Sequence, residues 1–126
     1  MKAEKLVEPE EQASLQRFIA GKSEYTLMLF DHFITELLKI GPINIHPHKT
    51  MISIVNTSKS VAYITYLGKD FMDVVFPFKE RLHDNLCFKR IQQVPGRHVI
   101  YHHFRMLHPY DVNDEVRKFM RMAYES

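Results

Sequence analysis

The chain has 126 residues, of which 45% are hydrophobic and 25% charged, and its formal net charge is +2. These values are ordinary for one globular domain and exclude a disordered chain. The single cysteine, Cys87, excludes an intramolecular disulfide and is typical of a reducing compartment. We find neither a signal peptide nor an apolar run long enough to span a bilayer, so we expect a cytoplasmic protein without a membrane partner.

The first third of the chain predicts two helices. Residues 1–8 are polar, and we expect them to be flexible. Pro9 suits the first turn of a short helix that ends at Gly21. Ser23 is a good N-cap for a longer helix that runs to about Ile40, and the apolar residues of this helix fill half of its circumference. Such a wide stripe predicts contacts with both a sheet and the first helix.

The middle of the chain predicts strands. Three apolar, β-branched segments separated by short turn clusters are typical of an antiparallel meander. These segments are residues 49–56, 61–67 and 71–78. Residues 79–94 fit a helical turn near 80–85 and a short strand near 88–92, and residues 97–107 alternate as a clear last strand.

After Pro109 and Tyr110, Asp111 is predicted to cap a final helix that has one narrow apolar seam. The elements together predict a single α+β domain over residues 9–126. Its core is an antiparallel meander sheet of about 4–5 strands, covered by N-terminal helices and a C-terminal helix.

Positive charge is concentrated in residues 79–110. Lysine and arginine outnumber acids there, and five of the eight histidines fall in the same segment. The basic residues are Lys79, Arg81, Lys89, Arg90, Arg97 and Arg105, and the acids are Glu80 and Asp84. A local basic surface attracts anionic partners, although a solvated face of mixed charge is the ordinary alternative.

The last strand places His102 on the same face as Ile100 and Phe104, because side chains two residues apart share a face. A histidine in that phase is predicted to be partly buried and to need a hydrogen-bond partner. It is either a satisfied core histidine or a group whose titration near neutral pH serves a site.

No catalytic or cofactor motif is present. His46 and His48 are two residues apart, as metal ligands sometimes are, but no further ligands accompany them. Cys87 has no nucleophile signature, and the phosphate-binding and dinucleotide-binding glycine patterns are absent. We therefore expect no metal and no cofactor, and the lack of a catalytic motif favours a protein that is not an enzyme without deciding the question.

The outer faces of the strands combine aromatic and basic residues. The candidates are Lys49, Tyr63, Tyr66, Lys69, Tyr101, His103 and Arg105. Aromatic rings between cations on a sheet can stack nucleic-acid bases and hold phosphates. Alternation alone does not decide which face carries Tyr63 and Tyr66.

Several short motifs, in this order along the chain, resemble one bacterial family. The motifs are Leu29-Phe30, Lys49-Thr50, Pro95-Gly96-Arg97, His102 with Arg105, Asp114-Glu115-Val116, Phe119-Met120 and Ala123-Tyr124-Glu125. Over residues 24–125 the chain resembles the uncharacterised family called domain of unknown function 5655, sometimes labelled predicted transport proteins. The resemblance implies a compact α+β domain without an established activity. Its members' nuclease-like neighbours imply a nucleic-acid setting, and Lys49, Arg97 and His102 become positions of interest.

The leading hypothesis is a non-enzymatic binding domain whose anionic partner is nucleic acid or another protein. Its candidate binding residues are Lys49, Arg97, His102, His103 and Arg105. One alternative is a small-molecule enzyme or ligand-binding domain that uses His102 as a general acid or base. Another is a homodimer that pairs through an exposed sheet edge.

Overall fold

The computed structural model describes residues 1–126. Six strands form one sheet: β1 (Asn44–Pro47), β2 (Ile52–Val55), β3 (Ser60–Leu67), β4 (Met72–Phe78), β5 (Phe88–Gln93) and β6 (Ile100–Met106). The α-helices are α1 (Gln12–Ile19), α2 (Glu24–Leu38) and α3 (Asp114–Glu125), and the short 3-10 helices are η1 (Lys2–Lys5), η2 (Pro9–Glu11) and η3 (Pro109–Asp111). None of the helices is long and apolar enough to cross a membrane.

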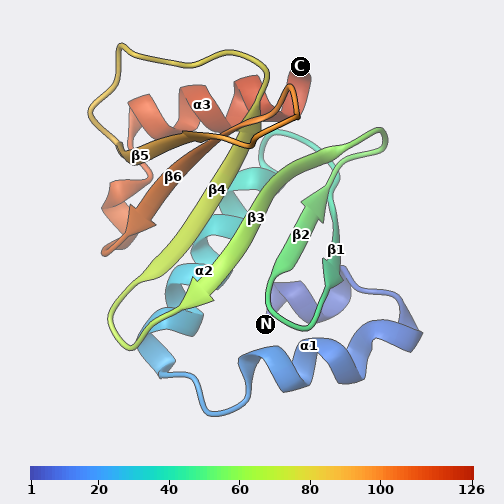
Figure 1. Cartoon of the computed structure of the whole chain (residues 1–126). Coiled ribbons are helices and arrows are strands. Elements are labelled where there is room, and N and C mark those ends of the chain that lie inside the picture. The colour runs from blue at the N-terminus through green and yellow to red at the C-terminus, as the bar shows by residue number, and fades with distance from the viewer.

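All neighbouring strands run antiparallel, in the spatial order β1-β2-β3-β4-β6-β5. Strands β2, β3 and β4 correspond to the three predicted hairpin-linked strands, and β1 extends this meander at its outer end. The chain then builds the outer strand β5 and returns by a hairpin, so that β6 lies between β4 and β5 (Figure 1). The predicted α+β class and antiparallel sheet are confirmed, with one strand more than expected. The additional strand is β1, which has four residues and ends in proline, a pattern too short to stand out in the sequence.

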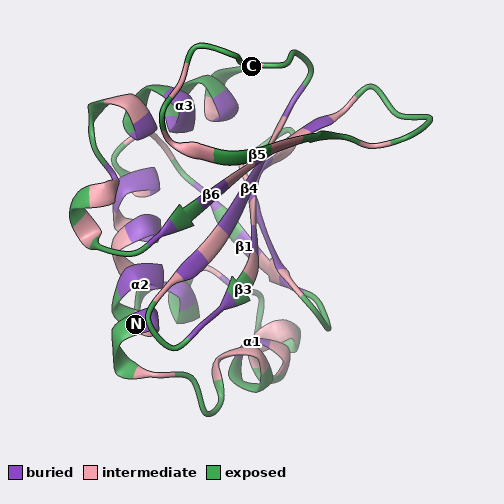
Figure 2. Cartoon of the chain, turned by 60° about the vertical axis from the view of Figure 1, so that its left-hand side comes forward, coloured by how far each residue is buried: buried purple, intermediate pink, exposed green.

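Helices α2 and α3 cover one face of the sheet, as Figure 2 shows. The wide apolar stripe of α2 supplies Phe30, Phe33 and Ile34, which are fully buried. The Phe33 ring meets that of Phe76 in β4, with 6.2 Å between the ring centroids. Burial of each such side chain stabilises the fold by about 1.5–3 kcal/mol. The opposite face has no helix over its centre, because α1 lies against β1 at one edge.

Side chains cap both covering helices. The Ser23 hydroxyl accepts a hydrogen bond from the Thr26 amide at 3.1 Å, as the sequence predicts for α2. The cap of α3 is Asn113, whose Oδ1 accepts from the Val116 amide at 2.9 Å. Asp111, the predicted cap, instead accepts from the amides of the two residues before Pro109 and closes the turn after β6.

Residues 1–8, for which the sequence predicts flexibility, lie against α2 and β1. The Lys2 amide donates to Asp31 of α2 at 2.9 Å, and Ala3 is fully buried. The Leu6 carbonyl accepts from the Ile45 amide of β1 at 3.0 Å. This segment therefore occupies the hydrogen-bonding position of Ile45 at the outer edge of β1, where a further strand would otherwise pair.

The segment between β4 and β5 is irregular, and the helical turn predicted near residues 80–85 does not form. Side chains hold the segment in place. Asn85 donates to the Leu82 carbonyl at 2.6 Å and accepts from the Phe88 amide at 3.1 Å. Glu115 of α3 accepts from the Leu86 amide at 2.9 Å. These local hydrogen bonds replace those of a helical turn.

Candidate functional site

The face of the sheet away from α2 and α3, called the open face below, carries aromatic and basic side chains. Residues paired across neighbouring antiparallel strands share a face. The register places four residues in one row across the open face: Tyr63, Val75, His103 and Arg90. A parallel row contains Pro77, Tyr101 and Gln92. The two rows bring residues from β3 to β5 onto one surface.

Two tyrosines meet above the middle of this face although their strands are not neighbours. Tyr63 of β3 and Tyr101 of β6 lie edge to face across β4, with 6.2 Å between ring centroids and 64° between ring planes. Val75 of β4 is only 3% exposed although it points to the open face. The two half-exposed rings form a platform whose surface is aromatic.

A second aromatic and charged cluster adjoins the tyrosine pair. The Arg105 guanidinium lies 4.0 Å from the centre of the Phe71 ring, and that ring lies 5.8 Å from the ring of Tyr66. Arg105 also donates two hydrogen bonds to Asp73, from Nε at 2.9 Å and from Nη2 at 3.0 Å. Lys89 of β5 lies 3.5 Å from the same carboxylate.

The charges in this cluster are mutually balanced. Burial by itself would raise the pKa of Asp73, but the hydrogen bonds from Arg105 and the positive charges of Lys89 and Arg105 outweigh it, so the pKa lies below its ordinary value. Asp73 is therefore ionised at neutral pH. It neutralises part of the positive charge of the open face and fixes the direction of the Arg105 guanidinium.

His103 stands between the tyrosine pair and the β5 edge. Arg90 Nη2 lies 3.3 Å from His103 Nε2, which accepts because arginine can only donate. Burial, with the positive charges of Arg90 and Lys89, lowers the pKa of His103 below its ordinary value. His103 is therefore neutral at neutral pH. It contributes a flat, uncharged ring beside Arg90, which forms no ion pair.

Together these side chains form an aromatic–cationic patch. It consists of Tyr63, Tyr66, Phe71, Lys89, Arg90, Tyr101, His103 and Arg105. The patch spans β3 to β5 and contains rings at its centre and cations along the β5 side. Lys89 and Arg90 were within the basic segment of the sequence but not among the candidate binding residues. A bulge between Phe88 and Arg90 turns Arg90 to the open face, and no sequence pattern announces it.

His102 lies on the other face, beneath the helices. It is fully buried, between the rings of Phe78 and Phe88 at centroid distances of 5.0 and 5.1 Å. Its Nε2 accepts from the Leu82 amide at 3.0 Å, and its Nδ1 donates to the Ile100 carbonyl at 3.0 Å. Both ring nitrogens are thus occupied by backbone groups. This geometry gives His102 the role of a satisfied core histidine.

The five candidate binding residues do not form one cluster. His103 and Arg105 share the open face, and His102 points away from it. Arg97 is exposed in the turn between β5 and β6, which Figure 2 shows projecting to the side away from α2 and α3. Lys49 lies in the turn after β1, at the far edge of the sheet. Arg97 can therefore extend the positive rim of the patch, whereas Lys49 belongs to another part of the surface.

Two hollows of the surface are large enough to consider as binding sites. One, of about 750 Å³, opens beside Tyr63 between the ends of β3 and β4 and the C-terminus of α3. Its walls mix Lys59 and Lys79 with Glu80 and Glu125, so neither sign of charge dominates. The other lies between α1 and the turn after β1. No three His, Cys, Asp or Glu side chains are grouped so that they could hold a metal ion.

Comparison of the chain with protein-family models, with curated proteins and with solved structures finds no match. The resemblance to domain of unknown function 5655 stays a prediction from the residues that carry it. The site must therefore be interpreted from its own chemistry.

Proposed function

We propose that this chain is a non-enzymatic binding module that holds single-stranded nucleic acid on its aromatic–cationic patch. The observation that carries the proposal is the edge-to-face pair of Tyr63 and Tyr101 in the middle of an uncovered sheet face. Half-exposed rings supported by a rigid sheet are suited to stacking unpaired bases, since every base has a flat face.

The cations of the patch supply the second half of the interaction. Arg90 makes no ion pair, and its remaining N–H groups are free for phosphate oxygens. Lys89 and Arg105 share one carboxylate, Asp73, so this cluster keeps a net positive charge. The rings and the cations lie side by side on the patch. A single nucleic-acid strand could therefore stack its bases on the rings while its phosphates bind the cations.

The arrangement favours a single strand over a duplex. A flat sheet face cannot enter the major groove, which admits a helix or a two-stranded ribbon. Bases inside a duplex also have no free faces to stack. The modest excess of cations predicts moderate, salt-dependent affinity with little sequence preference.

The geometry does not support the alternative in which His102 acts as a general acid or base. That role needs a ring nitrogen within reach of a substrate. Both nitrogens of this fully buried ring already bind backbone groups of Leu82 and Ile100. These two hydrogen bonds are better explained by a contribution of His102 to the stability of the fold.

The test measures binding of a fluorescently labelled single-stranded oligonucleotide of about 12 nucleotides by anisotropy, at about 50 mM salt. We expect Tyr63→Ala and Tyr101→Ala each to weaken binding by about 1–3 kcal/mol, which is roughly 5-fold to 150-fold. The matched control is Tyr110→Ala, because Tyr110 is 73% exposed in η3, outside the patch. Absence of binding at low salt, or equal losses in all three variants, would refute the proposal.

A further inference from the structure

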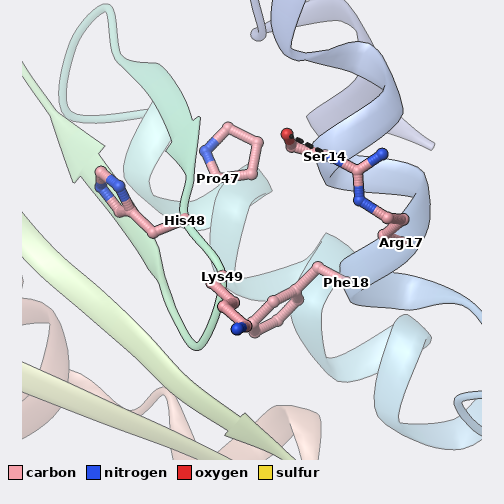
Figure 3. A pocket seen from close by; sticks show the side chains of 6 residues that line it. All are labelled: Ser14, Arg17, Phe18, Pro47, His48 and Lys49. Carbon is pink, nitrogen blue, oxygen red and sulfur yellow. Dashed lines mark hydrogen bonds between the residues drawn. The ribbon is translucent and has the colours of Figure 1, made fainter.

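A hollow of about 540 Å³ lies between α1 and the turn that follows β1. Figure 3 shows its walls: Ser14, Arg17 and Phe18 come from α1, Pro47 is the last residue of β1, and His48 and Lys49 come from the turn that follows. Residues three and four apart on a helix share one side, so the three α1 residues face the turn together. Phe18 and the buried Pro47 supply the apolar part of the walls.

The charge of this hollow has one sign. Arg17 and Lys49 line it, and no aspartate or glutamate does. Neither cation takes part in any of the ion pairs of the structure. Arg105 and Arg117, in contrast, each bind a carboxylate at 2.9 Å. Two cations without an acidic partner, on opposite walls of one hollow, leave an uncompensated positive field.

Local hydrogen bonds orient the polar groups of the hollow. Arg17 Nη2 donates to Ser14 Oγ at 3.1 Å, so the Ser14 hydroxyl hydrogen remains available as a donor. The other N–H groups of Arg17 have no protein partner. In Figure 3 the His48 ring turns away from α1. His48 Nε2 instead meets Ser53 Oγ of β2 at 2.9 Å.

We propose that this hollow is a phosphate-binding site that takes a phosphate monoester. Arg17 and Lys49 neutralise the phosphate charge, and the Ser14 hydroxyl donates to a third oxygen. Guanidinium and ammonium groups with free N–H donors are the side chains that bind phosphate best. The volume exceeds that of a phosphate ion, so the remainder of the ligand lies along Phe18 and Pro47.

The phosphate has two possible sources, a free phosphorylated small molecule or the terminal phosphate of a strand held on the open face. His48 connects the two regions, because its partner Ser53 pairs with Tyr63 in the sheet register. The site itself rests on the hollow and its charges, and so it is independent of the function proposed for the aromatic–cationic patch.

The first experiment titrates the full chain with inorganic phosphate and follows backbone amides by ¹H–¹⁵N NMR, with chloride at equal ionic strength as the reference. We expect saturable shifts at Ser14, Arg17 and Lys49 with phosphate alone. The double variant Arg17→Ala/Lys49→Ala should bind phosphate at least about tenfold more weakly. Both side chains are exposed, and circular dichroism checks that the variant stays folded.

The matched control is Lys118→Ala/Arg121→Ala, which removes the same charges from the exposed surface of α3 and should leave phosphate binding unchanged. Absent shifts, or equal weakening in both double variants, would overturn the site.

A second experiment identifies the source of the phosphate by comparing the same oligonucleotide with a 5′-phosphate and with a 5′-hydroxyl. Tighter binding of the phosphorylated strand that is lost in Arg17→Ala/Lys49→Ala supports a strand end. Phosphate titration with no such difference supports a free small molecule. If oligonucleotides do not bind at all, the patch proposal fails while the phosphate titration still decides this one.

Discussion

His102 accepts a hydrogen bond from the Leu82 backbone amide, with 3.0 Å between Nε2 and the amide nitrogen. A side chain of β6 thus holds the irregular segment that follows β4. The segment contains no helix or strand of its own, so side-chain hydrogen bonds such as this one and those of Asn85 and Glu115 hold it in place. In the sequence His102 is a candidate catalytic group, whereas in the structure its ring connects the sheet to this loop by a hydrogen bond.

Replacing this ring should cost considerable stability. In His102→Ala the Leu82 amide loses its acceptor and a void opens between Phe78 and Phe88, so we expect a loss of about 2–4 kcal/mol in the free energy of unfolding. Urea denaturation measures it. The control His98→Ala, at an exposed position of the turn after β5, should change stability by less than about 0.5 kcal/mol. Equal effects of the two substitutions would contradict the assigned role.

Stability should also depend on the protonation of His102. Burial lowers the pKa of His102, and the positive charge of Arg81 adds to this, against the opposing hydrogen bond to Ile100. The unfolded chain binds a proton below about pH 6.5 that the folded chain excludes. This contribution to stability is complete above that pH and is lost as the pH falls towards the lower pKa of the folded state.

Urea denaturation at about pH 7 and about pH 5 tests this dependence. Between these two values wild type should lose more stability than His102→Gln, which has no titrating ring. A loss of the same size in both proteins would show that His102 does not carry the effect.

Cys87 should be an unreactive thiol. Burial and the neighbouring Glu115 carboxylate raise the pKa of Cys87 to about 12, and only the thiolate is the nucleophile. We expect slow alkylation by iodoacetamide at neutral pH and fast alkylation after unfolding in urea. Glu115→Gln removes the repelling charge and should speed the reaction of the folded protein. A rate in the native state as fast as in urea would be inconsistent with this environment.

One ion pair joins the two covering helices. Glu36 of α2 is 5% exposed and accepts from Arg117 Nη2 of α3 at 2.9 Å. Burial would raise the pKa of Glu36, but Lys39 and Arg117 outweigh it and the pKa lies below its ordinary value. Arg117→Met should therefore destabilise the protein at neutral pH. The difference from wild type should shrink as the pH falls through the lowered pKa of Glu36, because the carboxyl is then protonated in both chains.

Thermal unfolding of wild type and Arg117→Met at neutral pH and at acidic pH measures this difference in stability. Arg121→Met on the exposed side of α3 is the control, because Arg121 makes no ion pair. A difference that stays constant with pH would mean that Arg117 contributes by packing alone.

Asp73 provides a gain-of-binding test of the open face. Asp73→Asn removes the negative charge that Arg105 and Lys89 share. Both cations are then free to bind phosphates of the oligonucleotide. Oligonucleotide affinity should rise, and the slope of log affinity against log salt should steepen by about 0.7 for each additional phosphate contact. Asp114→Asn, at an exposed position of α3, is the matched control. Unchanged affinity in Asp73→Asn would count against the patch as an anion site.

The sequence predicted the inner and outer faces of β6 correctly because the alternation there is regular. His102 and Phe104 point to the helices, and His103 and Arg105 point to the open face. The same rule fails for Tyr63 and Tyr66, which are three residues apart and so should face opposite sides. A bulge at Thr65 inserts one residue, and the register then puts both tyrosines on the open face. Such a bulge depends on strand pairing and leaves no local signal.

The partner of His102 was also beyond prediction, because an amide in an irregular loop has no periodicity to reveal it. Glu36 was missed for a related reason. Its position lies beside the apolar stripe of α2, and its burial is compensated by Lys39 of its own helix together with Arg117 from a distant helix. Local sequence patterns therefore predict the helices, the strands and their faces. The hydrogen bonds and ion pairs between elements join residues that are far apart in the chain, and local patterns do not predict them.

The contact of Leu6 with β1 has a consequence for self-association. With residues 1–8 in place, the Ile45 amide at one border of the sheet is already bonded to Leu6, and the other border, β5, carries Lys89 and Arg90, which repel a second copy. A chain shortened by those eight residues would expose the Ile45 amide on a short, nearly uncharged border. Residues 1–8, which the sequence predicts to be flexible, therefore help to protect this border from pairing with a second copy.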